Sequence, residues 1–246
     1  MFKSPESAIV DVARERIYVS NVNGYTENGL GYLTALDLNG EAVAEKWIEG
    51  INAPTGLAIS GDTLYVVDFN RLLEIDISQA KVRATYPVTE DNPGLNDVTV
   101  SPSGDVFVSS SNLAAIYKLQ DGSLQSWVQD DQLKWANGVL AEESRLIVAG
   151  FHLMNIDLAS KVVTPFSAGA EFQALEDLES IEADGDQGYY LTQIGDKPIM
   201  HISEEGKLSV ALTRKGYSAD IDYQPKRKMM VVPRAEDTVY AYRVDR

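Results

Sequence analysis

A pattern of short apolar runs recurs six times along the chain, and this repeat constrains the fold more than any other feature of the sequence. The six runs are, in chain order, PESAIVD, PTGLAIS, LNDVTVS, ANGVLAE, LESIEAD and SADIDYQ. Their second residues are separated by 49, 41, 41, 42 and 40 positions. So regular a spacing along 246 residues indicates one structural unit repeated six times.

Each repeat continues through further short runs of strand-forming residues. A turn of small and charged residues follows the first run, and β-branched or aromatic runs such as LYVVD and VFVSS come next. A third run and, in most repeats, a weaker fourth run complete the unit. Four strands per unit of about 41 residues predict an all-β, six-bladed β-propeller that forms a single domain over residues 1–246. Another all-β sandwich or barrel is the alternative.

The first and last repeats depart from the pattern. The first contains the Gly/Asn-rich segment NVNGYTENGLG, which follows the second strand of its repeat. Because second strands end where the innermost strands begin, we expect residues 22–30 to form a lid over that end of the propeller's central channel. The last repeat has only three strands before Arg246, and four residues precede Pro5. We therefore expect either a three-stranded last blade or further N-terminal residues in the natural protein, including a removed targeting signal.

Composition narrows the range of partners. Acidic residues number 37 against 21 Lys and Arg, which gives a net charge of −16. Such a surface repels phosphate backbones and anionic membranes, so neither nucleic acid binding nor membrane binding is expected. Without cysteine, disulfides, zinc–thiolate sites and cysteine nucleophiles are excluded. No apolar run approaches the ~20 residues of a membrane span. No signal peptide is visible, and the compartment stays open between cytoplasmic and periplasmic or secreted.

The innermost strands of a propeller line its axis, so equivalent residues of successive repeats form a ring around the channel. The second residues of the six runs are Glu6, Thr55, Asn96, Asn137, Glu179 and Ala219. Two carboxylates and two amides at one channel mouth are costly unless they are neutralised and hydrogen-bonded. A divalent cation would do both, and the oxygen donors favour Ca²⁺, with Mg²⁺, Mn²⁺ or Zn²⁺ as further candidates. Ordinary turn residues before a strand are the alternative.

Further polar residues should border the same mouth. Second strands end at Asn21, Asp68 and Arg234, and the lid carries Tyr25. Asp97 and Asp220 occupy the next repeat position. We expect these residues, together with Asn96, to contact a small-molecule substrate. The two histidines, His152 and His201, are assigned to third strands and to structural roles, and the tryptophans to packing between blades.

The ring residues resemble those of the gluconolactonase/regucalcin family, also called senescence-marker-protein-like lactonases. PESAIVD is similar to the family's Gly-Glu-Gly-Pro strand, LNDVTVS to its Asn-Asp-Gly strand, and ANGVLAE to its Pro-Asn-Gly segment. LESIEADGDQGYYLT is similar to the family's Asp-Gly strand, with Glu179 where an aspartate is usual. The segment before Asn96 reads Pro93-Gly94-Leu95, where family members often carry an arginine.

The resemblance implies a metal-dependent hydrolase of a sugar lactone or related ester. Glu6, Asn137 and Glu179 would then hold one divalent cation, and Asn96 would contact substrate or water. Glu179 would be the catalytic residue that accepts the proton of the attacking water. The alternative is a non-catalytic NHL-like binding propeller whose axis holds a structural ion or a small ligand.

Overall fold

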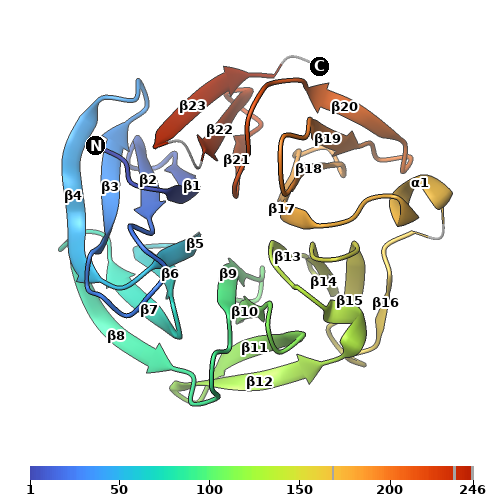
Figure 1. Ribbon diagram of the computed structural model, residues 1–246, viewed down its shortest axis with the longest axis horizontal. Helices are drawn as coiled ribbons and strands as arrows, with labels where there is room; N and C mark the ends of the chain where they lie inside the picture. The colour runs from blue at the N-terminus through green and yellow to red at the C-terminus, as the bar shows by residue number, and fades with distance from the viewer. Residues whose placement is uncertain (168, 235–236, 245–246) are drawn as a thin grey trace.

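Six antiparallel sheets surround a central axis in the computed structural model, which describes residues 1–167, 169–234 and 237–244 (Figure 1). Five sheets have four strands, and the sixth has three. The predicted six-bladed propeller is therefore confirmed, and the last blade is the three-stranded one that the sequence offered as an alternative.

The strands of each blade follow one another in chain order from the axis outward. The first three blades comprise β1 (Pro5–Asp11), β2 (Arg16–Asn21), β3 (Gly31–Asp37), β4 (Ala42–Ile51), β5 (Pro54–Ser60), β6 (Thr63–Asp68), β7 (Arg71–Asp76), β8 (Lys81–Pro87), β9 (Leu95–Val100), β10 (Val106–Ser110), β11 (Ala115–Gln120) and β12 (Ser123–Gln129). The last three comprise β13 (Val139–Ala141), β14 (Arg145–Val148), β15 (Met154–Asp157), β16 (Val163–Pro165), β17 (Leu178–Ala183), β18 (Tyr189–Gln193), β19 (Ile199–Ile202), β20 (Leu208–Leu212), β21 (Asp222–Gln224), β22 (Met229–Arg234) and β23 (Thr238–Arg243). A short 3-10 helix, η1 (Asp131–Leu133), precedes β13, and α1 (Ala170–Gln173) precedes β17.

The apolar pattern of each strand follows from its position in the blade. Second strands are covered on both faces by neighbouring blades, and all five residues of β10 are buried. Outer strands face solvent on one side, so β8 alternates strictly between exposed and half-buried residues. The core lies between the blades: Leu33 of blade 1 and Leu64 of blade 2, for example, belong to one buried cluster. Burial of these apolar faces is the main force that holds the blades together.

In four blades the pairing between the innermost strand and the second strand is irregular near the first residues of the innermost strand. The register shifts there in the pairs β1–β2, β5–β6, β9–β10 and β17–β18. Neighbouring inner strands approach closely at this point, and the Gly138 amide donates to the Glu179 carbonyl at 2.9 Å. A Cβ on Gly138 would lie 2.6 Å from the Cα of Ser180, which explains why this position needs glycine.

Among the residues that the structure describes, no sheet takes strands from both ends of the chain, although the Asp220 amide donates to the Glu6 carbonyl at 2.9 Å. Lys3 pairs with Asp237 at 2.9 Å, and the Ser4 amide donates to the same carboxylate at 2.7 Å. The Val10 amide donates to Asp222 Oδ2 at 2.6 Å. β1 consequently lies beside β21 and β22, as Figure 1 shows. Side-chain carboxylates of the last blade thus replace the strand exchange that closes many propellers.

Within the described parts of the chain, no helix has the length and apolar character needed to cross a membrane.

Candidate functional site

The first polar ring lies at the end of the channel where the inner strands begin, which we call the channel mouth. Glu6, Asn96 and Glu179 are the second residues of β1, β9 and β17, and Asn137 lies two residues before β13. Asn137 Nδ2 donates to Glu179 Oε2 at 3.2 Å. Glu6 and Glu179 are close enough for the charge of Glu179 to act on Glu6. The structure therefore brings at least three of the four residues together.

Two oxygen atoms of this ring are buried acceptors that lack a donor. Glu6 Oε2 and Asn96 Oδ1 have no hydrogen-bond partner among the described residues. Burial of an unpaired polar oxygen is costly, because its hydrogen bonds to water are lost without replacement. A cation or a bound donor group at the channel mouth would remove this cost.

Glu179 is held by two hydrogen-bond donors. Burial raises its pKa to about 7, although the Tyr217 hydroxyl and the Asn137 amide partly offset that shift by hydrogen-bonding the carboxylate. Burial raises the pKa of Tyr217 itself, and the charge of Glu179 raises it further. Tyr217 was missed by the sequence analysis because it lies just before the sixth apolar run rather than within it. Its proximity to the repeat start was the only available signal.

Further carboxylates lie deeper in the channel. Asp97 accepts the amides of Val98 at 2.7 Å and Val139 at 2.8 Å, and burial raises its pKa to about 7. Asp220 accepts the Ser7 hydroxyl at 2.7 Å, and burial, followed by the charge of Asp97, raises its pKa. Both side chains therefore line the channel. Asp97 also joins β9 to β13, and Asp220 joins the last repeat to β1.

The sequence analysis missed Glu182 and Asp222, which share the fifth position of the last two repeats. Burial raises the pKa of Asp222 to about 6, and burial together with the charges of Asp222, Asp220 and Asp97 raises that of Glu182. These four carboxylates line a channel cavity of about 290 Å³. Their occurrence at one repeat position in two successive units was a detectable signal.

The described residues contain no metal site built from His, Cys, Asp and Glu side chains alone. In the described part of the chain, no three His, Cys, Asp or Glu side chains are grouped so that they could hold a metal ion. The predicted set of Glu6, Asn137 and Glu179 contains only two carboxylates and an amide, so this search does not address it. Its role stays a proposal.

The predicted lid lies over the channel mouth. The Tyr25 hydroxyl donates to the Leu95 carbonyl at 3.3 Å, at the first residue of β9. The Tyr25 ring also packs edge-on against Phe69, with 5.5 Å between centroids. Burial and the nearby Glu6 charge raise the pKa of Tyr25 to about 12. The loop therefore extends from blade 1 to blade 3 at the end where Glu6 lies, which confirms its expected position.

Three other expected substrate contacts have their polar groups occupied elsewhere. Asn21 Nδ2 donates to the Val19 carbonyl and the Thr34 hydroxyl, and its Oδ1 accepts the Lys3 amide. Asp68, which is fully buried, accepts two backbone amides from residues 52 and 53 and pairs with an arginine three residues later. These strand-end residues fix turns and blade connections.

The third, Arg234, lies with its guanidinium over the Tyr240 ring of β23, 5.4 Å from the centroid. β23 is the outermost strand of the last blade. This contact holds the guanidinium against the last blade, and the substrate-binding role of Arg234 stays a prediction.

The two histidines differ in their positions. His201 lies in β19, buried, with Nε2 2.9 Å from Asp184 Oδ2, in agreement with the expected structural role. His152 does not lie in a strand, contrary to expectation, because β15 begins only at Met154. It belongs to the connection between β14 and β15, which lies at the channel-mouth end of blade 4.

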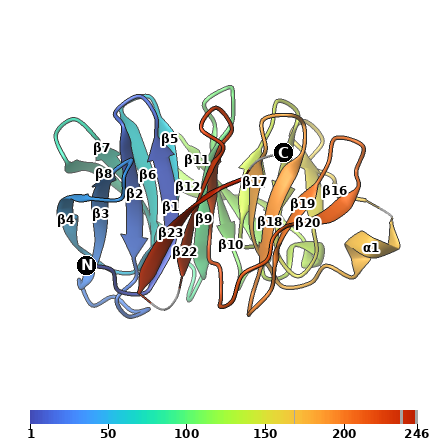
Figure 2. The same ribbon diagram turned by 90° about the horizontal axis from the view of Figure 1, so that it is seen from above.

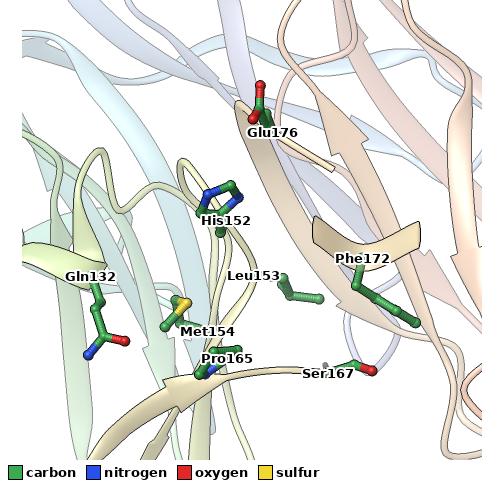
Figure 3. A pocket seen from close by; sticks show the side chains of 8 residues that line it. All are labelled: Gln132, His152, Leu153, Met154, Pro165, Ser167, Phe172 and Glu176. Atoms are coloured by element: carbon green, nitrogen blue, oxygen red, sulfur yellow. The ribbon is translucent and has the colours of Figure 1, made fainter. Parts of the chain in front are cut away.

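His152 borders a cavity of about 500 Å³, which we call the rim cavity (Figure 3). Its lining residues are Gln132, His152, Leu153, Met154, Pro165, Ser167, Phe172 and Glu176. Figure 2 shows α1, which contains Phe172, toward the same face of the molecule as the N-terminus. The rim cavity thus lies at the periphery of the face that carries the polar ring.

The fold defines a six-bladed β-propeller, an architecture that it shares with solved lactonase and lyase structures. A gluconolactonase from Xanthomonas campestris superimposes with a TM-score of 0.78 at 11% identity, covering 100% of this chain and 87% of its own. The virginiamycin B lyase of Staphylococcus aureus gives 0.68 at 13% identity, with coverage of 99% and 85%. A streptogramin B lyase gives 0.67 at 9% identity, with coverage of 99% and 94%. At these identities the likeness shows the fold alone.

No family model matches the sequence, and no curated protein matches it either.

Proposed function

We propose that this chain is a divalent-metal-dependent hydrolase of a lactone or related ester, with its active site at the channel mouth. The observation that carries the proposal is the pair of buried, unpaired acceptors, Glu6 Oε2 and Asn96 Oδ1, in the ring that also holds Asn137 and Glu179. The shared fold with a gluconolactonase adds support.

The residues present fit a hard divalent cation. Glu6, Asn137 and Glu179 would hold it, because all three offer oxygen and two carry negative charge when ionised, which suits Ca²⁺ first and Mg²⁺ or Mn²⁺ next. Asn137 donates to Glu179 through Nδ2, so its amide oxygen is the atom left for a cation. When bound, the cation would act as a Lewis acid on the carbonyl of the substrate and on water.

The side chains around the proposed reaction centre have separate tasks. Glu179, whose carboxylate lies in the ring, would accept the proton of the attacking water. The Tyr217 hydroxyl and the Asn137 amide fix the orientation of its carboxylate. Asn96 would position the substrate, and Tyr25 would help to exclude bulk water. Hydrolysis of a neutral lactone creates a carboxylate, which the acidic channel would repel and so help to release.

The test is hydrolysis of a broad panel of lactones and esters after chelation and after readdition of Ca²⁺, Mg²⁺ or Mn²⁺. We expect activity that a chelator removes and one of these ions restores. Glu179→Gln should abolish it, because the amide keeps the shape but cannot take a proton. Glu143→Gln, which changes an exposed glutamate of a turn, is the matched control and should retain activity. An ion-dependent rise in melting temperature without any hydrolysis would favour the non-catalytic binder.

A further inference from the structure

We propose that the rim cavity and the neighbouring Trp135 bind the apolar part of the substrate, so that the preferred substrate is a neutral lactone or ester with a hydrophobic chain or ring. This inference rests on the proposed function and specifies its substrate class. It departs from a polar sugar lactone, which would have no use for an apolar cavity beside the reaction centre.

The rim cavity has the size and lining of a small-molecule site. Its volume of about 500 Å³ falls within the roughly 300–1,000 Å³ typical of ligand pockets. Leu153, Met154 and Phe172 form its apolar walls, and each is at least nine-tenths buried. His152 and Gln132 supply polar groups at its edge, as Figure 3 shows. A few polar groups around an apolar interior fix the orientation of an amphipathic ligand.

Backbone hydrogen bonds join the polar ring to the connection between β14 and β15, which also carries the cavity residue His152. The Ala149 carbonyl accepts the Asn137 amide at 2.7 Å. The next carbonyl, that of Gly150, accepts the Leu178 amide at 2.8 Å, and Leu178 directly precedes Glu179. His152 follows two residues later and lies in the cavity lining. The proposed substrate would span from the ring, with its carbonyl at Asn137 and Glu179, to the rim cavity, with its apolar substituent there.

Trp135 is largely exposed, although its backbone conformation disfavours a large side chain, and its ring lies against Phe151 and the Lys134 ammonium. Its backbone adopts a left-handed φ of 57°, and the equivalent residue of the preceding repeat is Gly94, also at 57°. A bulky residue is disfavoured in this conformation. The side chain is nevertheless 49% exposed, whereas Trp47 and Trp127 pack against Tyr18 and Phe107. The sequence expectation of interblade packing is therefore wrong for Trp135.

Trp135 lies next to the segment that borders the rim cavity. Its ring packs edge-on against Phe151 with 5.5 Å between centroids, and Phe151 in turn contacts His152 at 4.6 Å. Because Trp135 is two residues before Asn137, it extends the apolar surface from the rim cavity toward the polar ring. Such an aromatic surface offers contact area for a ring or chain.

Charge excludes an anionic substrate. Glu176 lines the rim cavity, and the channel mouth carries Glu6 and Glu179. Neither Lys nor Arg is present among the lining residues that the structure describes. Inside the cavity a carboxylate-bearing ligand would meet the charge of Glu176, whereas the Lys134 ammonium lies outside the lining, 4.6 Å from the centroid of the Trp135 ring, so a neutral lactone or ester is the better match.

The experiment compares γ-butyrolactones that carry alkyl substituents of increasing length with glucono-δ-lactone, at saturating metal. We expect kcat/KM to rise with chain length by up to about fourfold per methylene until the cavity is filled. Trp135→Ala, and Ser167→Trp, which fills the cavity, should each remove most of this dependence through KM and leave kcat within about twofold. Tyr240→Ala changes an exposed aromatic residue on the last blade and should behave as wild type.

Binding separates this inference from the proposed function. Alkyl-substituted cyclopentanones cannot be hydrolysed, and calorimetry should show tighter binding of longer chains that both variants weaken. If hydrolysis occurs but neither kcat/KM nor binding depends on chain length, the rim-cavity inference fails and the lactonase proposal stands. If no substrate is hydrolysed yet the cyclopentanones bind in a chain-length-dependent and Trp135-dependent manner, the cavity is a binding site and the hydrolase proposal fails.

Discussion

The carboxylates in the channel should make the metal-free protein less stable as the pH rises. Burial raises the pKa of Asp97 from 3.8 to about 7 and that of Asp222 from 3.8 to about 6. The folded state therefore keeps protons that the unfolded chain releases above about pH 4. Where the folded state binds more protons, the free energy of unfolding falls with increasing pH, and the fall ends once the folded carboxylates have ionised.

The size of this effect follows from the two pKa values. Each pH unit over which one group is protonated only in the folded state lowers the free energy of unfolding by about 1.4 kcal/mol. Between pH 5 and pH 8, Asp97 contributes over about two units and Asp222 over about one, which together amount to about 4 kcal/mol. A domain of ordinary stability, about 5–15 kcal/mol, would lose a substantial fraction.

Urea unfolding at pH 5, 6, 7 and 8 in the presence of a chelator, followed by tryptophan fluorescence, measures this dependence. Glu182→Gln should raise the free energy of unfolding at pH 8 and flatten the curve, because it removes a carboxyl group whose own pKa is raised by burial and by the charges of Asp222, Asp220 and Asp97. Glu143→Gln should leave the slope unchanged. A stability that is constant or rises from pH 5 to pH 8, or a Glu182→Gln slope equal to that of wild type, would refute the reasoning.

Three further changes test the fold and the lid. Gly138→Ala should destabilise the protein by about 1–3 kcal/mol in urea unfolding, because the new Cβ would lie 2.6 Å from Ser180 Cα; an unchanged midpoint would contradict the close approach. Tyr25→Phe removes the hydrogen bond to Leu95 and should speed proteolysis within residues 22–30 while changing global stability by no more than about 1.5 kcal/mol; equal cleavage rates would count against the lid. Asp237→Ala removes the acceptor that joins the N-terminal segment to the last blade, so amide exchange should accelerate first in β1 and β23; uniform exchange would argue against a weak closure.

The sequence predicted the blades because strand alternation and a fixed spacing are local properties that survive without knowledge of contacts. It also predicted the first polar ring, since equivalent repeat positions must lie at equal heights along the axis. Glu182 and Asp222 were missed because only the first positions of each repeat were compared. The irregular pairing near the start of the inner strands brings additional residues into the channel, and this irregularity has no clear mark in the sequence.

Residues at strand ends were harder to interpret. Asn21 and Asp68 look like site residues by position, but backbone amides and neighbouring side chains occupy their polar groups. A sequence does not reveal whether a buried polar side chain satisfies the backbone or faces a ligand. Tyr217 illustrates the opposite case, because its proximity to Glu179 depends on how the chain returns from β20 to the axis before β21.

The closure of the ring also determines when the site can exist. Glu6 belongs to the first blade, whereas Tyr217 and Asp220, which belong to the last repeat, act on the same group of side chains. Domains generally assemble as their chains emerge, and here five blades can form before the sixth supplies its part. A chain that stalls or is cut within the last blade would therefore carry most of the core but an incomplete channel mouth. The channel mouth is thus complete only when the last repeat has joined the first blade.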